Sequence, residues 1–135
     1  QNIRTVKPEQ LGELVDFISI DVAFISLDKV LPVATTLLKD TGSLVALIKP
    51  QFEAGKEKVG KGGIVRDRLV HEEVLQRILQ VAYECQLYLH GLTCSPIKGT
   101  EGNIEFLGYF TKSEDGALSI TDELITNVVD EAHAL

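Results

Sequence analysis

Three charged residues stand beside apolar segments where side-chain chemistry could take place. Asp21 and Lys49 each follow an apolar run rich in β-branched residues, and Glu105 lies early in a third such run. Pro50 comes directly after Lys49 and has no backbone N–H, so the second run must end as a strand at that point. A lysine between two carboxylates could orient or deprotonate a hydroxyl group. The three residues therefore form a candidate catalytic set, provided that the fold brings them to one edge.

Each of these residues also has a purely structural interpretation. Charged side chains are common where a strand meets water, and a lysine between carboxylates can be a plain ion-pair network. Taken singly, Asp21 and Glu105 fit the structural interpretation better than the catalytic one. Lys49 is the stronger candidate, because Pro50 stops the strand at that residue. The pattern alone leaves both interpretations open.

The segment after Lys49 is rich in glycine and in basic residues. Residues 49–68 carry a net charge of +3, whereas the whole chain carries −7. A basic island on an acidic protein can concentrate an anionic ligand such as an RNA backbone. The candidate RNA-binding residues are Lys56, Lys58, Lys61 and Arg66. A solvated loop that happens to be rich in lysine explains the charge equally well.

Apolar patterns predict the elements that would position these residues. Continuous or alternating apolar runs predict strands at residues 15–21, 43–49, 86–97 and 103–112. Helical spacing predicts helices at residues 26–40, 68–85 and 120–135. Ser26 and Thr121 are expected to cap the first and last helix, and Gly42 is expected to close the first. In the second helix the predicted apolar stripe begins at Leu69.

The order of these elements is typical of the α/β class. Alternating strands and helices predict parallel strands with crossover helices, and the last two strands should form an antiparallel pair at one edge. Ligands of such sheets bind at the carboxyl ends of the parallel strands, and the last strand would begin at the same edge. Glu105 would then face Asp21 and Lys49. Residues 15–21 would form an exposed edge strand, which indicates the carboxyl half of a larger doubly wound sheet.

Composition narrows the class of protein. The 135 residues are 44% hydrophobic and 24% charged, which is typical of one globular domain, and we expect a cytoplasmic location. No apolar run approaches the roughly 18–20 residues of a membrane helix. Cys85 and Cys94 lack the spacing of zinc ligands, so we expect no metal and two reduced, half-buried thiols. Because the chain begins with Gln1, we expect residues upstream of it.

Three motifs resemble the hemolysin-A-type (TlyA-like) family of ribosomal RNA 2′-O-methyltransferases, which is related to FtsJ-like enzymes. They are DVAFISL, LIKPQFEAGKEKVGKGGIVRD and SPIKGTEGNIEF, and the resemblance extends to about Phe110. It implies a class I, S-adenosylmethionine-dependent methyltransferase sheet of the Rossmann-like type. Residues 1–135 would be the carboxyl part of that domain. The upstream half with the cofactor loop and a small S4-like RNA-binding domain would be absent.

The resemblance also implies roles for single residues. The family's catalytic set is Lys–Asp–Lys–Glu, and its last three positions match Asp21, Lys49 and Glu105. Asp21 and Val22 would line the S-adenosylmethionine pocket. The first lysine has no counterpart here, and Ala23 stands where serine is expected. We therefore expect three of four catalytic positions and a chain that is inactive alone, with ribosomal RNA or ribosomal subunits as the partner.

Ribose methylation suits these residue types. A ribose hydroxyl is a weak nucleophile that must be aligned with the methyl group and relieved of its proton. Lys49 could act on it as a base if neutral, or as an orienting donor if charged. Two other functions stay open: a non-catalytic RNA- or anion-binding module that uses the basic loop, and the membrane activity that the name hemolysin implies. The negative net charge and core-packing helices give membrane activity no support.

Overall fold

The computed structural model describes residues 14–22, 25–53, 67–95 and 103–134. Its elements are, in order, β1 (Val15–Ile20), α2 (Leu27–Leu37), β2 (Leu38–Ile48), α3 (Pro50–Glu53), α4 (Arg68–Glu84), β3 (Tyr88–Cys94), β4 (Phe106–Thr111) and α5 (Asp122–His133). The predicted order of strands and helices is confirmed, with the short helix α3 as an addition. The chain is therefore an α/β protein, as its sequence predicts.

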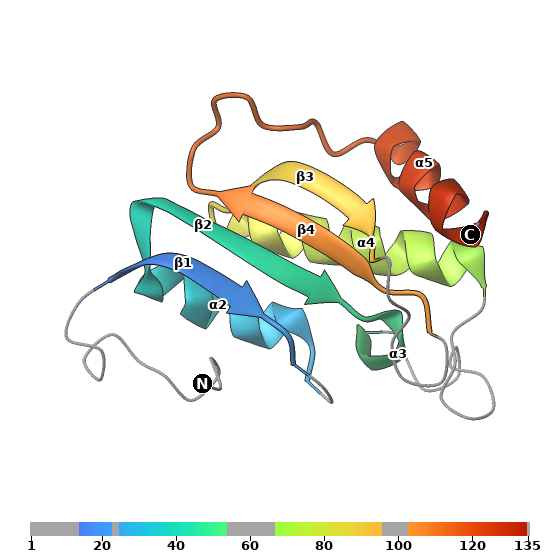
Figure 1. Ribbon diagram of the computed structural model, residues 1–135, viewed down its shortest axis with the longest axis horizontal. Helices are drawn as coiled ribbons and strands as arrows, with labels where there is room; N and C mark the ends of the chain where they lie inside the picture. Colours follow the sequence, from blue (N-terminus) through green and yellow to red (C-terminus); the bar gives the residue numbers. More distant parts are fainter. Residues whose placement is uncertain (1–13, 23–24, 54–66, 96–102, 135) are drawn as a thin grey trace.

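The four strands form one mixed sheet in the order β1-β2-β4-β3 (Figure 1). β1 pairs with β2 in parallel, and β4 runs antiparallel to both β2 and β3. The predicted antiparallel pairing of the last two strands is confirmed. β4 itself, however, lies inside the described sheet, and of these two strands only β3 is at an edge. After β2, the crossover through α4 leaves one strand position between β2 and β3. β4 then runs back between β2 and β3.

One face of the sheet forms the hydrophobic core with the helices. Figure 1 shows α2 behind β1 and β2, α4 behind β4, and α5 next to β3. On this face, alternate residues of the two central strands are buried. They include Leu44, Ala46, Ile48, Phe106 and Phe110. Their burial against the helices is the main source of stability, because each large apolar side chain contributes about 1.5–3 kcal/mol.

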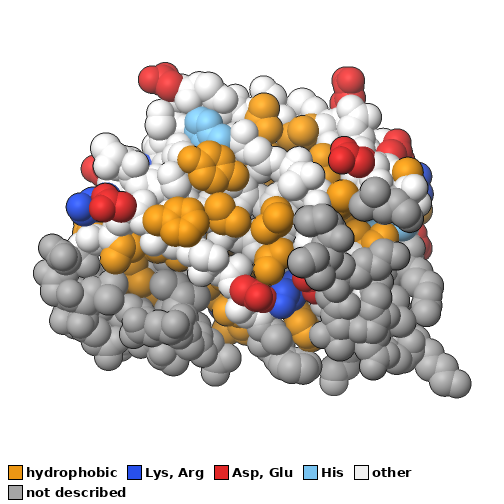
Figure 2. All heavy atoms as spheres, in the orientation of Figure 1, with side chains coloured by type: hydrophobic (Ala, Val, Ile, Leu, Met, Phe, Trp, Pro, Cys, Tyr) orange, Lys and Arg blue, Asp and Glu red, His pale blue; other side chains and the backbone are white. Residues whose placement is uncertain are grey.

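The other face of the sheet, which faces the viewer in Figure 2, is more open. Phe17 of β1 is 57% exposed and Tyr109 of β4 is 41% exposed. The intervening positions of β2 on this face, Val45 and Leu47, are only partly buried. Within the described residues, β1 is an edge strand, as predicted. Hydrophobic side chains therefore gather on a face that no described helix covers.

Two local predictions are wrong. Gly42 does not close the first helix: α2 ends at Leu37, and Gly42 lies within β2. A Cβ there would stand 2.6 Å from Cδ1 of Leu38 and 2.9 Å from the carbonyl oxygen of Asp16, so glycine permits a close approach of β2 to β1. Leu69 is 65% exposed and does not join the apolar stripe of α4. His71 takes that place, fully buried and edge-on to the ring of Phe106.

Both predicted helix caps are confirmed. The side chain of Ser26 accepts from the backbone N–H of Asp28 and caps α2, and Thr121 accepts from Leu124 and caps α5. Cys85 and Cys94 are both free. Within the described part of the chain, no helix is long and apolar enough to cross a membrane. No group of three potential ligand side chains in that part could hold a metal ion.

Candidate active site

The ends of β1 and β2 meet the start of β4 at one edge of the sheet. Ile48, the last residue of β2, pairs with Phe106, the first residue of β4. Lys49 directly follows β2 and Glu105 directly precedes β4, so both lie at the point where the antiparallel pairing ends. Asp21 follows the last residue of the neighbouring strand β1. The structure thus brings the three predicted catalytic residues to the same edge.

Lys49 forms an ion pair with Asp21. Its Nζ contacts Oδ1 of the aspartate. The side chain of Lys49 is only 16% exposed, whereas that of Asp21 is 60% exposed. The ammonium group therefore stands largely out of bulk water, while the carboxylate that balances its charge is open to solvent or to a ligand.

Glu105 is held by Gln51 rather than by Lys49. Its carboxyl group, in a residue that is 6% exposed, accepts from Nε2 of Gln51 at 2.9 Å. Its backbone carbonyl accepts from the N–H of Ser95 at 2.8 Å. The amide oxygen of Gln51 is buried and has no hydrogen-bond partner among the residues that the structure describes. A buried acceptor without a partner costs about 1–3 kcal/mol, so this oxygen is suited to receive a donor from a bound molecule.

Glu53, at the end of α3, joins the two chain segments that carry Asp21 and Lys49. Its Oε1 accepts from Oγ of Ser26 at 2.5 Å, and its Oε2 accepts from the backbone N–H of Leu27 at 2.8 Å. Both partners lie at the start of α2, shortly after Asp21. A carboxylate is favourable there because the first N–H groups of a helix lack internal partners and the helix N-terminus is positive.

Arg77 of α4 completes this network. Its Nη2 donates at 2.9 Å both to Oε1 and to the backbone carbonyl of Glu53. The side chain of Glu53 is 2% exposed, so the carboxylate is buried and fully partnered. The sequence pattern did not single out Glu53, Arg77 or Gln51. The signal available for Glu53 and Gln51 was their place in the KPQFEAG motif directly after Lys49.

Of the remaining predicted site residues, Val22 lies within the described part of the chain and the basic residues do not. Val22 follows Asp21 and packs, partly buried, against the core. The predicted RNA-binding residues Lys56, Lys58, Lys61 and Arg66 lie outside the described residues. The basic loop therefore stays a prediction from sequence. What the described edge offers is a shielded ammonium group, an open carboxylate and an unpartnered amide oxygen.

Comparison with known proteins gives this edge a context. The family model of FtsJ-like methyltransferases matches residues 1–112. YqxC of Bacillus subtilis (strain 168), named as a candidate rRNA methyltransferase, is 44% identical over 135 residues, which are 98% of this chain and 48% of the relative. The 16S/23S rRNA (cytidine-2′-O)-methyltransferase TlyA of Mycobacterium tuberculosis (strain ATCC 25618 / H37Rv) is 36% identical over 118 residues, which are 87% of this chain and 44% of the relative.

A solved structure from Streptococcus thermophilus, described as a candidate hemolysin, shares the fold. It superposes with a TM-score of 0.89 at 42% identity, covering 99% of this chain and 48% of that chain. The chain thus spans about half the length of the curated relatives it matches.

Proposed function

Because this chain belongs to the family of FtsJ-like methyltransferases, we propose that it is the carboxyl part of an enzyme that methylates a ribose 2′-hydroxyl of ribosomal RNA. The observation that carries the proposal is the shielded Lys49, paired with Asp21 at the strand edge beside Glu105. Similarity to rRNA cytidine-2′-O-methyltransferases supports the substrate class. A cytoplasmic location would follow from a ribosomal RNA substrate.

The residues at this edge fit S-adenosylmethionine as the methyl donor. That cofactor would supply an electrophilic methyl group on a positively charged sulfur. The exposed carboxylate of Asp21 suits a cationic ligand, and the apolar side chain of Val22 directly follows it. These two residues would contribute one wall of the cofactor pocket. The sheet would then be the carboxyl half of a class I methyltransferase sheet.

Lys49 would act on the ribose oxygen. As an ammonium group held by Asp21, it can donate a hydrogen bond that fixes the ribose oxygen. The same hydrogen bond stabilises the negative charge that develops there as the hydroxyl proton passes to solvent water and the oxygen takes up the methyl group. The amide oxygen of Gln51, which has no partner among the described residues, can accept a hydrogen bond from the ribose hydroxyl. Glu105 would act indirectly, since its carboxyl group holds the Gln51 amide in place.

The first lysine of the Lys–Asp–Lys–Glu set has no counterpart in this chain. We therefore expect the chain alone to be inactive and to bind S-adenosylmethionine weakly or not at all. Calorimetric titration of the 135-residue chain measures this directly. Micromolar affinity for the cofactor would contradict the expectation that half of the cofactor pocket lies elsewhere.

The catalytic role of Lys49 is tested in a protein of the relatives' length that carries this chain. We expect Lys49→Ala to reduce methyl transfer from labelled S-adenosylmethionine to ribosomal RNA by about 100-fold or more, with RNA affinity unchanged. The matched control is Lys39→Ala, since Lys39 forms an ion pair with Asp16 between the same two strands. Retained methylation with weaker RNA binding would instead favour a non-catalytic RNA-binding module.

A further inference from the structure

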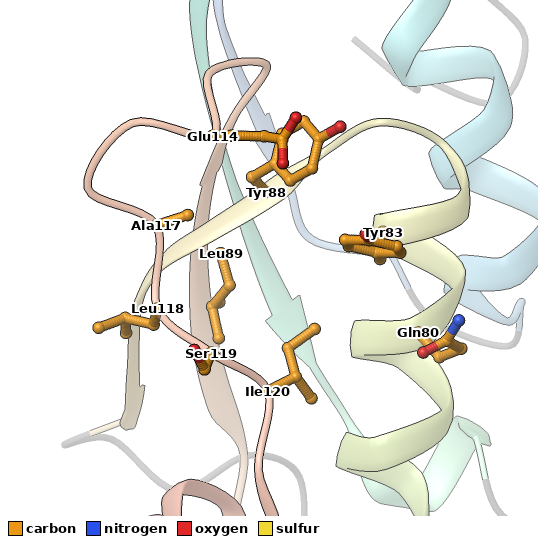
Figure 3. Close-up of a pocket in the computed structure, with 9 residues that line it drawn as sticks. All are labelled: Gln80, Tyr83, Tyr88, Leu89, Glu114, Ala117, Leu118, Ser119 and Ile120. Atoms are coloured by element: carbon orange, nitrogen blue, oxygen red, sulfur yellow. The ribbon is translucent and has the colours of Figure 1, made fainter.

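A cavity lies at the end of the sheet opposite to Lys49. It has a volume of about 440 Å³ and lies between α4, the start of β3 and the segment after β4 (Figure 3). Tyr83 enters from α4, Tyr88 and Leu89 from β3, and Glu114 and Ile120 from the last segment. The volume is in the range of small-molecule sites. This cavity shares no residue with the proposed methyltransferase site.

Two tyrosine rings provide the aromatic part of the cavity. The rings of Tyr83 and Tyr88 meet edge to face, with centroids 5.7 Å apart and an interplanar angle of 89°. This arrangement leaves ring faces that are not stacked on each other. Tyr83 is 52% exposed, so its ring is accessible from solvent. A cation within about 6 Å of such a ring is attracted by its negative face.

The charge at the cavity is negative. Figure 3 shows Glu114 beside the ring of Tyr88. Partial burial and the negative charge of Glu114 raise the pKa of the Tyr88 phenol, so this hydroxyl is neutral at physiological pH. Among the described residues that line the cavity there is no lysine or arginine. A carboxylate next to aromatic and aliphatic side chains is complementary to a cation with an apolar stem.

The wall of the cavity is held in place by backbone contacts. Gly116 adopts a φ of +79°, which glycine tolerates best, and turns the chain after β4. The N–H of Ala117 donates to the carbonyl of Glu114 at 3.0 Å, and the N–H of Leu118 donates to the carbonyl of Leu89 at 2.7 Å. The segment is thus bonded to the edge strand β3. The cavity is preformed, which lowers the entropy cost of binding.

We propose that this cavity binds an alkylammonium or guanidinium group carried on an aliphatic stem. The stem would pack on Leu89 and Ile120, and the cation would lie between a tyrosine ring and the carboxylate of Glu114. The same chemistry has two sources, a free polyamine or the side chain of a lysine or arginine on a protein partner. The site goes beyond the proposed methyltransferase function, because it lies at the other end of the sheet.

The tyrosine content of the chain allows a direct test. The chain has three tyrosines and no tryptophan, and Tyr109, on the open face of the sheet, does not line the cavity. With ¹³C-labelled tyrosine rings, we expect Nα-acetyl-arginine amide or spermidine to shift the signals of Tyr83 and Tyr88 in a saturable way, and to leave Tyr109 unchanged. The tighter of the two probes identifies the source. Uncharged Nα-acetyl-citrulline amide should cause no shift.

A pair of variants tests the carboxylate. Glu114→Gln should weaken binding of the tighter probe by about fivefold or more, since it removes the only charged partner among the described lining residues. Asp115→Asn is the matched control, because Asp115 is an exposed neighbour that does not line the cavity. Glu114 is itself exposed, so its exchange should not disturb folding. Absence of any shift, equal shifts with the citrulline probe, or unchanged binding by Glu114→Gln would each overturn the proposal.

Discussion

Two ion pairs of the same residue types join β1 to β2, one at each end of the parallel pairing. Lys49 pairs with Asp21 at the carboxyl end, and Lys39 pairs with Asp16 at 3.3 Å near the start. The side chain of Lys49 is 16% exposed, whereas that of Lys39 is 47% exposed. An exposed pair contributes only about 0–1 kcal/mol and is screened by salt. The two pairs thus have the same residue types but differ in how far their lysine is exposed to solvent.

The surroundings differ because the chain takes a different course after each lysine. After Lys49, Pro50 ends the strand and α3 begins, and Glu53 then fastens α3 to the start of α2 and to Arg77. After Lys39 the chain continues within β2. Lys49 is therefore shielded where a strand ends and a fastened helix follows, whereas Lys39 lies within a strand and stays open to solvent. Residue type alone does not make that distinction.

The largest expected effect comes from removing the hydrogen-bond network next to Lys49. Glu53→Ala removes a buried carboxylate that accepts from Ser26, Leu27 and Arg77. We expect the free energy of unfolding to fall by about 2 kcal/mol, because hydrogen bonds to a charged group contribute about 1.5–3 kcal/mol and Arg77 is partly in water. Urea denaturation measures the change, with Asp16→Ala as the control on an exposed carboxylate. A loss as small as that of the control would mean that the network does not fasten α3.

A second variant disturbs the packing of β2 against β1 near Lys39. Gly42→Ala would place a Cβ 2.9 Å from the carbonyl oxygen of Asp16, so that β2 must shift away from β1. We expect a destabilisation of about 1–3 kcal/mol, as for other overpacked sites. Methyl transfer by a protein of the relatives' length should persist at temperatures where the variant is folded. Loss of activity equal to that of Lys49→Ala would show that the two ends are not independent.

The two pairs can also be compared directly by double-mutant cycles. We expect a coupling energy of up to about 1 kcal/mol for Lys49 with Asp21, and of about 0.2 kcal/mol for Lys39 with Asp16. Because the Lys49 pair is less open to solvent, salt at about 1 M should reduce its coupling less. Equal coupling energies with equal salt dependence would mean that the two ion pairs do not differ in energy.

The smallest effect concerns an exposed charge at the cavity end of the sheet. Tyr88 should titrate above its ordinary pKa of 10.0, because partial burial and the charge of Glu114 both disfavour the phenolate. Since the pKa is raised in the folded state, the stability from this group is present below the unfolded pKa and is lost as pH rises through the folded pKa. Glu114→Gln should lower the pKa of Tyr88, which ring NMR signals would report. An unchanged pKa would mean that the two groups do not interact.

Local signals predicted the elements well. Ser26 and Thr121 cap helices as expected, because a cap depends on residues two or three positions away. The prediction failed for Gly42, where the reason for glycine is contact with Leu38 and with the neighbouring strand. It also failed for Leu69: the buried stripe of α4 is otherwise as predicted, but tertiary packing begins it with Val70 and His71 instead. Both failures involve packing against other elements, which a local window does not contain.

By itself, the sequence determined the order of strands and helices, the end of β2 before Pro50 and the motifs of the methyltransferase family. The tertiary structure decided that β4 inserts between β2 and β3, which places Glu105 beside Lys49. It also decided the partners of Glu53 and the walls of the cavity at the other end of the sheet. The physical reason is range: propensity, capping and proline act over a few residues, whereas strand pairing and buried networks join residues that are far apart in the chain.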